Sequence, residues 1–345
     1  MKKLALIFLM LLPFTALGAQ RQAEGLDVTE MIFEHIGDSY EWHITKLNGR
    51  DVTIHLPIIV CGKNCGWQCF SSARLADGAE YRGLRIARKG EEFEGKVVER
   101  DGARWRRPFD ISITKTVLAL MMDSLLLMLL ILLCARWYRT HDVMKEAPRG
   151  LAGLMEPLIM MVNDDIIKSA IGPDYRKYSP YLLTAFFFIL INNLMGIIPF
   201  FPGGANVTGN IAITFILALC TFLAVNLFGN KHYWKDILWP DVPVFLKLPL
   251  PLMPLIEIVG LFTKPFSLMI RLFANILAGH AMILGVVSVI FVTASMAPAI
   301  SSSMSVIAVI FGVFMNCLEL LVAFIQAYVF TMLSSVFIGM SRQNE

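Results

Sequence analysis

The chain has 345 residues, of which 56% are hydrophobic, and its mean hydropathy is +0.63. This composition excludes a water-soluble globule and predicts an all-α polytopic membrane protein. The formal net charge is only +3, and no dense basic patch with interleaved aromatic residues occurs, which excludes nucleic acid as the main partner.

The first twenty residues, MKKLALIFLMLLPFTALGAQ, begin with two lysines, continue with an apolar run and end in small residues. This order is typical of a bacterial secretory signal. We therefore predict a signal peptide over residues 1–19 and export of the segment that follows it. An uncleaved membrane anchor is the alternative.

Residues 20–112 are charged and contain no run long enough to cross a bilayer. Residues 51–60 alternate in the manner of a strand, and residues 81–88 and 96–100 flank a Gly/Glu-rich turn as a hairpin does. The pattern predicts a small extracytoplasmic domain with some β structure.

Three cysteines of this domain, Cys61, Cys65 and Cys69, follow a C-x3-C-x3-C spacing, with His43 and His55 upstream. The spacing fits no standard zinc pattern. In an exported domain we expect one disulfide and one odd thiol, with a metal site as the less favoured alternative.

The membrane domain is expected over residues 113–345. Its first predicted span, residues 114–136, has an apolar stretch over residues 117–135 that is interrupted only by Asp123. Basic residues at the end of this span and after it mark the cytoplasmic side: Arg136, Arg139, Lys145 and Arg149. Residues 151–171 mix apolar and charged positions and predict an amphipathic helix on or near the membrane surface.

Residues 179–201 and 208–229 are uncharged and predict two further spans. Asn192 and Asn193, in the first of them, are candidates for lining a proton path from the exported side. Hydrogen bonding between helices explains these asparagines equally well. The loop between the two spans is uncharged, which suggests that it lies on the exported side.

Residues 248–341 are strongly apolar and must fold back at residues 293–303, TASMAPAISSS. Two long helices, over about 249–292 and 303–341, then form a C-terminal hairpin. The spans number about five, with the N-terminal domain in the periplasm and the C-terminus in the cytoplasm. Basic loops agree with this orientation in a cell inner membrane.

Ionisable residues are few in this hairpin, and each costs roughly 2.5 to 3.5 kcal/mol on insertion scales, so they are the first candidates for function. At about 100° per residue, one helical stripe carries Glu257, Lys264, Arg271 and Asn275. His280 points in another direction from this stripe.

His280 lies before the hairpin turn and Glu319 about as far after it, so the two are expected at similar depth. Gln326 shares a helical face with Glu319. Histidine titrates near neutral pH and burial can raise a glutamate toward it, so the two side chains could relay protons. A buried structural ion pair is the alternative.

The stretch SLMIRLFANILAGH, preceded by Glu257 and by Lys264-Pro265, resembles the signature of subunit a of bacterial F-type (F1Fo) ATP synthases. The matching positions are Arg271, Leu272, Phe273, Asn275, Ala278 and Gly279. Residues 319–330 resemble the last helix of that family. The resemblance covers roughly residue 150 to the C-terminus, so the exported domain is an addition to the common pattern. His280 and Glu319 reverse the family's usual bacterial order, which leaves an acid–base pair in place.

The resemblance implies a proton-conducting stator with two aqueous half-channels against a rotating c-ring. Arg271 would meet a carboxylate of that ring, and Gln326 would face the rotor near it. The other residues implied on the proton path are His280, Glu319, Asn275, Glu257, Asn192 and Asn193. Implied partners are the c-ring of small hairpin subunits, the peripheral-stalk b subunit, other ATP synthase subunits and membrane lipid. Nucleotide chemistry would belong to other subunits, and no cofactor or metal is expected.

Two other classes of function fit this apolar sequence less well. A stand-alone ion channel or secondary transporter would need its own substrate site and often an internal repeat, and no convincing repeat occurs. An intramembrane hydrolase would need a Ser-centred glycine motif, a His-Glu-x-x-His helix or a similar motif, and the sequence has none of these.

Overall fold

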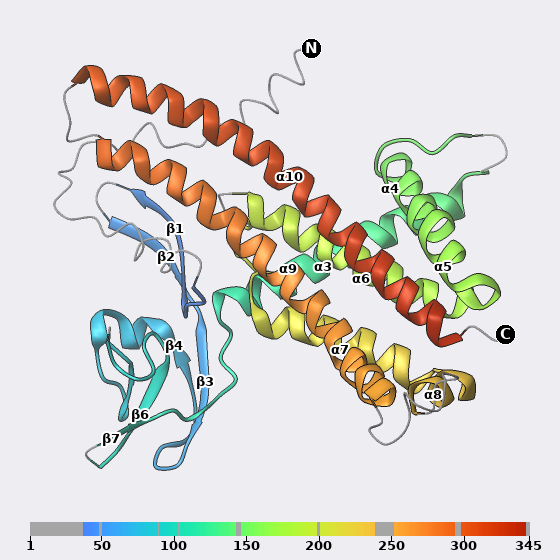
Figure 1. Cartoon of the computed structure of the whole chain (residues 1–345). Coiled ribbons are helices and arrows are strands. Elements are labelled where there is room, and N and C mark those ends of the chain that lie inside the picture. The colour runs from blue at the N-terminus through green and yellow to red at the C-terminus, as the bar shows by residue number, and fades with distance from the viewer. Residues whose placement is uncertain are drawn as a thin grey trace.

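The computed structural model describes residues 37–47, 50–88, 90–102, 104–142, 146–198, 201–238, 252–293 and 298–342. Figure 1 shows a small β domain beside one end of a group of helices. We call this the β-domain end of the helices. The expected signal peptide lies outside the described residues.

Eight short strands form three antiparallel sheets in the β domain, with the orders β1-β2, β4-β3-β8 and β5-β6-β7. The strands are β1 (Glu41–Leu47), β2 (Arg50–His55), β3 (Pro57–Gly62), β4 (Gly66–Ser71), β5 (Leu84–Ile86), β6 (Val97–Asp101), β7 (Arg104–Arg106) and β8 (Phe109–Asp110), with a 3-10 helix at Ser72–Gly78. The expected hairpin is present as β5 and β6, which pair Leu84 with Glu99.

The single strand expected over residues 51–60 is wrong, because the chain changes sheets at Leu56. Its backbone N–H donates to the Tyr40 carbonyl and to Ser72 Oγ, so β2 pairs with β1 while β3 pairs with β4. The alternation itself holds on β3, where Ile58 and Val60 are fully buried. With Leu75, Leu84 and Val97 they form the core of the domain.

The helices are α3 (Lys115–Thr140), α4 (Leu151–Met160), a π-helical segment (Met161–Lys168), α5 (Ser169–Ile171), a 3-10 turn (Gly172–Asp174), α6 (Tyr175–Ile197), α7 (Ile211–Leu227), α8 (Lys231–Leu238), α9 (Leu252–Thr293) and α10 (Pro298–Arg342). Among the described residues, four helical stretches are long and apolar enough to cross a membrane: Lys115–Thr140, Leu151–Ile197, Met253–Val289 and Met304–Arg342. The segment expected as a fifth span is the shorter apolar helix Ile211–Leu227. The chain is thus a helical polytopic membrane protein.

The segment from α4 to α5 is amphipathic, as expected, but its apolar face is occupied by the chain's own helices. Val162, Ile166 and Ile167 are buried in the main helical core, while Asp164 and Asp165 are exposed. The contact with α10 is close: a Cβ on Gly339 would collide with the Ala170 carbonyl oxygen.

The two longest helices, α9 and α10, run side by side, and α6 packs against α10 (Figure 1). Leu182, Phe186 and Ile189 of α6 are fully buried in the core that these helices share. The expected turn of the hairpin is shorter than residues 293–303, because α10 already begins at Pro298.

The β domain is fastened to the membrane helices at two places. Asp38 Oδ1 accepts a hydrogen bond from Thr116 N, and the Ser39 carbonyl accepts one from Lys115 N, so the domain caps the start of α3. Trp42 packs on Ala205 and Val207 of the α6–α7 loop. This loop therefore lies between the β domain and the helices.

Candidate functional site

His280 on α9 and Glu319 on α10 form an ion pair or hydrogen bond, with 2.6 Å between Nδ1 and Oε1. Their side chains are 17% and 6% exposed. Gly279 permits the close approach, since a Cβ there would lie only 3.3 Å from Glu319 Oε1. The two residues expected at similar depth are thus brought together.

A small cavity of about 10 Å³ adjoins this pair. Its polar lining comes from three elements and a loop: Asn192, Asn193, Asn206, Thr208, His280 and Glu319. A cavity of roughly this size holds about one water molecule when polar partners are present. The site thus combines an acid, a base and space for water.

Three buried polar atoms around this cavity have no hydrogen-bond partner among the described residues: Glu319 Oε2, Asn192 Oδ1 and Asn206 Nδ2. Each unmet group of this kind costs about 1–3 kcal/mol. By contrast, Asn193 is satisfied, because it accepts from Thr208 Oγ1 at 2.6 Å and donates to the Ala323 carbonyl at 3.2 Å. The unmet atoms favour binding of water in the cavity.

Arg271 lies on the side of α9 that is opposite to His280, and its side chain is exposed. It makes no ion pair or hydrogen bond with any described residue. Its neighbours Leu268 and Leu272 are buried in the helix core. Within two turns of Arg271, the exposed positions on the same helical face are small or polar: Ser267, Ala274, Asn275 and Ala278. Small residues let another helix approach closely, and an unpaired guanidinium in an apolar helix calls for an acidic partner.

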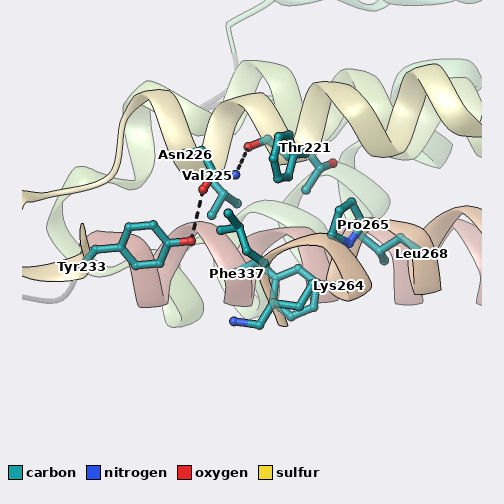
Figure 2. A pocket seen from close by; sticks show the side chains of 10 residues that line it. Thr221, Val225, Asn226, Tyr233, Lys264, Pro265, Leu268 and Phe337 are labelled. Carbon is teal, nitrogen blue, oxygen red and sulfur yellow. Dashed lines mark hydrogen bonds between the residues drawn. The ribbon is translucent and has the colours of Figure 1, made fainter. Parts of the chain in front are cut away.

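A second pocket, of about 20 Å³, lies farther from the β domain, between α7, α9 and α10. Figure 2 shows Tyr233 directed at Asn226, and the Tyr233 hydroxyl donates to Asn226 Oδ1 at 3.4 Å. Lys264 also lines this pocket and lies 5.7 Å from the centre of the Phe337 ring. Arg271 therefore lies along α9 between two pockets that polar side chains help to line.

The remaining residues expected on the path are spread over both regions. Glu257 is half-buried near the start of α9; burial first, and then the nearby Glu257 carboxylate, raise the pKa of Tyr233. Gln326 was expected to face the rotor, but it is only 6% exposed, on the inward face of α10 that also carries Glu319. It does not share the exposed surface of Arg271.

Comparison with known proteins gives two matches along the chain. Residues 120–339 match the family described as ATP synthase A chain, and residues 31–111 match a domain of unknown function, DUF8433. The chain belongs to the ATP synthase A chain family. All the site residues lie within the part that matches this family.

Similar curated relatives include subunits a of bacterial ATP synthases. The protein from Chlorobium phaeobacteroides is 41% identical over 242 residues, which cover 69% of this chain and 67% of the relative. The protein from Myxococcus xanthus is 39% identical over 264 residues, which cover 74% and 79%.

The cysteines of the β domain do not show the expected disulfide: Cys61, Cys65 and Cys69 are free thiols. Within the part of the chain that the structure describes, no group of three or more His, Cys, Asp or Glu side chains could hold a metal ion. Cys65 lies instead beside a buried carboxylate, and burial together with Glu99 raises the pKa of its thiol.

Proposed function

We propose that this chain is the proton-conducting stator subunit of an F-type ATP synthase, which forms two aqueous half-channels against the c-ring and couples proton translocation to rotation. The observation that carries the proposal is Arg271, which is exposed, has no ion-pair partner among the described residues and lies along α9 between two pockets that polar side chains help to line. Membership of the ATP synthase A chain family supports it.

The exported-side half-channel contains the cavity at His280 and Glu319. A proton arriving from the exported side binds to this acid–base pair, and the asparagines hold water around it. The pocket with Lys264, Tyr233 and Asn226 belongs to the cytoplasmic-side half-channel, and Glu257 lies near its mouth.

Arg271 separates the two half-channels. Arginine stays protonated at physiological pH, so it cannot relay a proton, and its positive charge stabilises a bare carboxylate of the c-ring in a low dielectric. It also repels protons that would pass directly between the half-channels. Each proton that crosses 100 mV releases about 2.3 kcal/mol, which drives rotation only if this short circuit stays closed.

The chain takes five spans in the bacterial inner membrane, with the helix Ile211–Leu227 as the third. The signal peptide sends the β domain to the periplasm, and the C-terminus lies in the cytoplasm. The other partners are the peripheral-stalk b subunit, the remaining ATP synthase subunits and membrane lipid. A stand-alone channel or transporter is the second candidate, and it would conduct ions without a c-ring.

Cysteine cross-linking tests the placement of the ring. Because Cys69, Cys220 and Cys317 are exposed, all three are first changed to serine. Ala278→Cys, on the face of Arg271, is expected to cross-link to the c-ring subunit, whereas Met121→Cys on α3, which is also exposed in this chain, is not. A chain that purifies without a ring and still conducts protons would favour the stand-alone channel.

A further inference from the structure

Asp123 is a buried carboxyl group that the site described above does not use. It lies within α3 and is only 2% exposed, and its Oδ1 has no hydrogen-bond partner among the described residues. The buried positions of α3 form one face of the helix: Thr116, Ala119, Asp123, Leu127 and Cys134. An acid on the inward face of a spanning helix is costly, which indicates a function.

The surroundings of this face place Asp123 beside the loop that lines the cavity. One turn before it, Ala119 packs on Ala205 and Val207; one turn after it, Leu127 packs in the main helical core. Asn206 lies between Ala205 and Val207. Its Nδ2 has no hydrogen-bond partner within the described part of the chain, and it lines the cavity with His280 and Glu319. The loop therefore has α3 on one side and the acid–base pair on the other.

Among the residues that the structure describes, Asp123 forms no ion pair with the elements packed against it. Residues 182–197 of α6 and residues 201–210 carry no ionisable side chain. On α4, Glu156 is placed beside Tyr138, toward the other end of α3. At the start of α3, two turns away, Lys115 lies near Asp38, and on β1 Glu41 bonds to His55 at the surface. Asp123 is thus not half of a structural ion pair.

We propose that Asp123 is a further proton-binding site of the exported-side path. Its carboxylate takes a proton from water on the exported side and returns it to water beside Asn206, which passes it to the His280–Glu319 pair. The carboxylate is then restored, and no other reactant is needed. This inference rests on the proposed function, and it adds a proton acceptor on a helix outside the α9–α10 hairpin.

Two matched pairs of variants separate titration from packing. The first pair is the wild-type aspartate and Asp123→Asn, which have side chains of the same size. The second pair is Asp123→Glu and Asp123→Gln, which are both one methylene longer. In each pair the amide cannot bind and release a proton at physiological pH. The assay is passive proton conduction through the complete membrane sector in vesicles, with recovery of the assembled complex measured alongside. Cys134→Ala, on the same buried face, is the control.

We expect the wild type, Asp123→Glu and Cys134→Ala to conduct at similar rates. Both amide variants should conduct roughly a hundredfold more slowly, the low end of what a positioned proton-transfer group contributes. Wild-type conduction in assembled Asp123→Asn or Asp123→Gln complexes would overturn the inference and leave the proposed function intact. If wild-type vesicles conduct no protons, the proposed function fails and this inference with it.

Discussion

At the scale of single residues, the contact between His280 and Glu319 joins a base on α9 to an acid on α10. Replacing either with leucine should slow ATP-driven proton pumping, because one relay group is lost and the other is left buried without a partner. The double exchange His280→Glu with Glu319→His should retain more activity than the two single exchanges predict together. Pumping rates in membrane vesicles measure this, and simply additive losses would show that the pair does not act as a unit.

Glu99 gives a prediction about pH. Its carboxylate accepts from the backbone N–H groups of Lys63, Asn64 and Cys65 at 2.8–3.0 Å. Burial alone would raise the pKa of Glu99, but these donors outweigh it and hold the pKa below its ordinary value of 4.5.

Because the pKa of Glu99 is lower in the folded state, the ionised carboxylate stabilises the folded state above pH 4.5. This stabilisation is lost as the pH falls through the folded-state pKa. We expect protection of the β3–β4 turn against amide hydrogen exchange, corrected for intrinsic rates, to disappear in that acid range in the whole protein. Glu99→Gln should lose most of the protection at neutral pH as well. Equal protection in both proteins would contradict this account.

Some residues of the site could be predicted from the sequence, and others could not. His280, Glu319 and Arg271 stand out because ionisable groups are rare in apolar helices, and hairpin geometry was enough to place the first two together. Asn206 and Thr208 could not be found, since polar residues are ordinary in loops and only the folded chain brings this loop to the cavity. The place of Gln326 against the rotor came from the family resemblance and stays a prediction; in this chain the side chain is buried on the inward face of α10.

At the scale of elements, Trp42 of β1 holds the α6–α7 loop in position. It is 4% exposed, its ring lies edge-on to that of Phe201 at 5.2 Å, and it packs on Ala205 and Val207. The same loop carries Asn206 and Thr208 into the cavity. The β domain therefore supports the loop that lines the His280–Glu319 cavity, which is the wall of the proposed exported-side half-channel.

Trp42→Ala should remove about 3–5 kcal/mol of packing and loosen this loop. Proton conduction from the exported side should fall several-fold, while Trp42→Phe restores most of it. Trp67→Ala is the matched control, because Trp67 belongs to the same domain but is 65% exposed. If both alanine variants conduct alike in assembled complexes, the domain does not support the path.

The long helices could be predicted from hydropathy alone, with boundaries within a few residues of α3, α6, α9 and α10. The break between β2 and β3 could not, because Leu56 is apolar like its neighbours and the change of sheet depends on partners far along the chain. The apolar face of the α4–α5 segment was recognised, but periodicity does not distinguish a membrane surface from a neighbouring helix.

At the scale of the whole molecule, the proposed orientation follows from the signal sequence and the basic loops. A reporter that is active only outside the cytoplasm should work when inserted near Gly90, in the β domain. A reporter that is active only in the cytoplasm should work when fused after Glu345. Activity of one reporter type at both sites would contradict an odd number of spans.

The central claim is that Arg271 couples proton flow to rotation, and respiration-driven ATP synthesis in membrane vesicles tests it most directly. Arg271→Ala should abolish synthesis in complexes that still assemble, as judged by recovery of all subunits. Arg271→Lys should also fail largely, because a buried amine can lose its proton and lacks the planar guanidinium fork. Near-normal synthesis in an assembled Arg271→Ala complex would contradict the account.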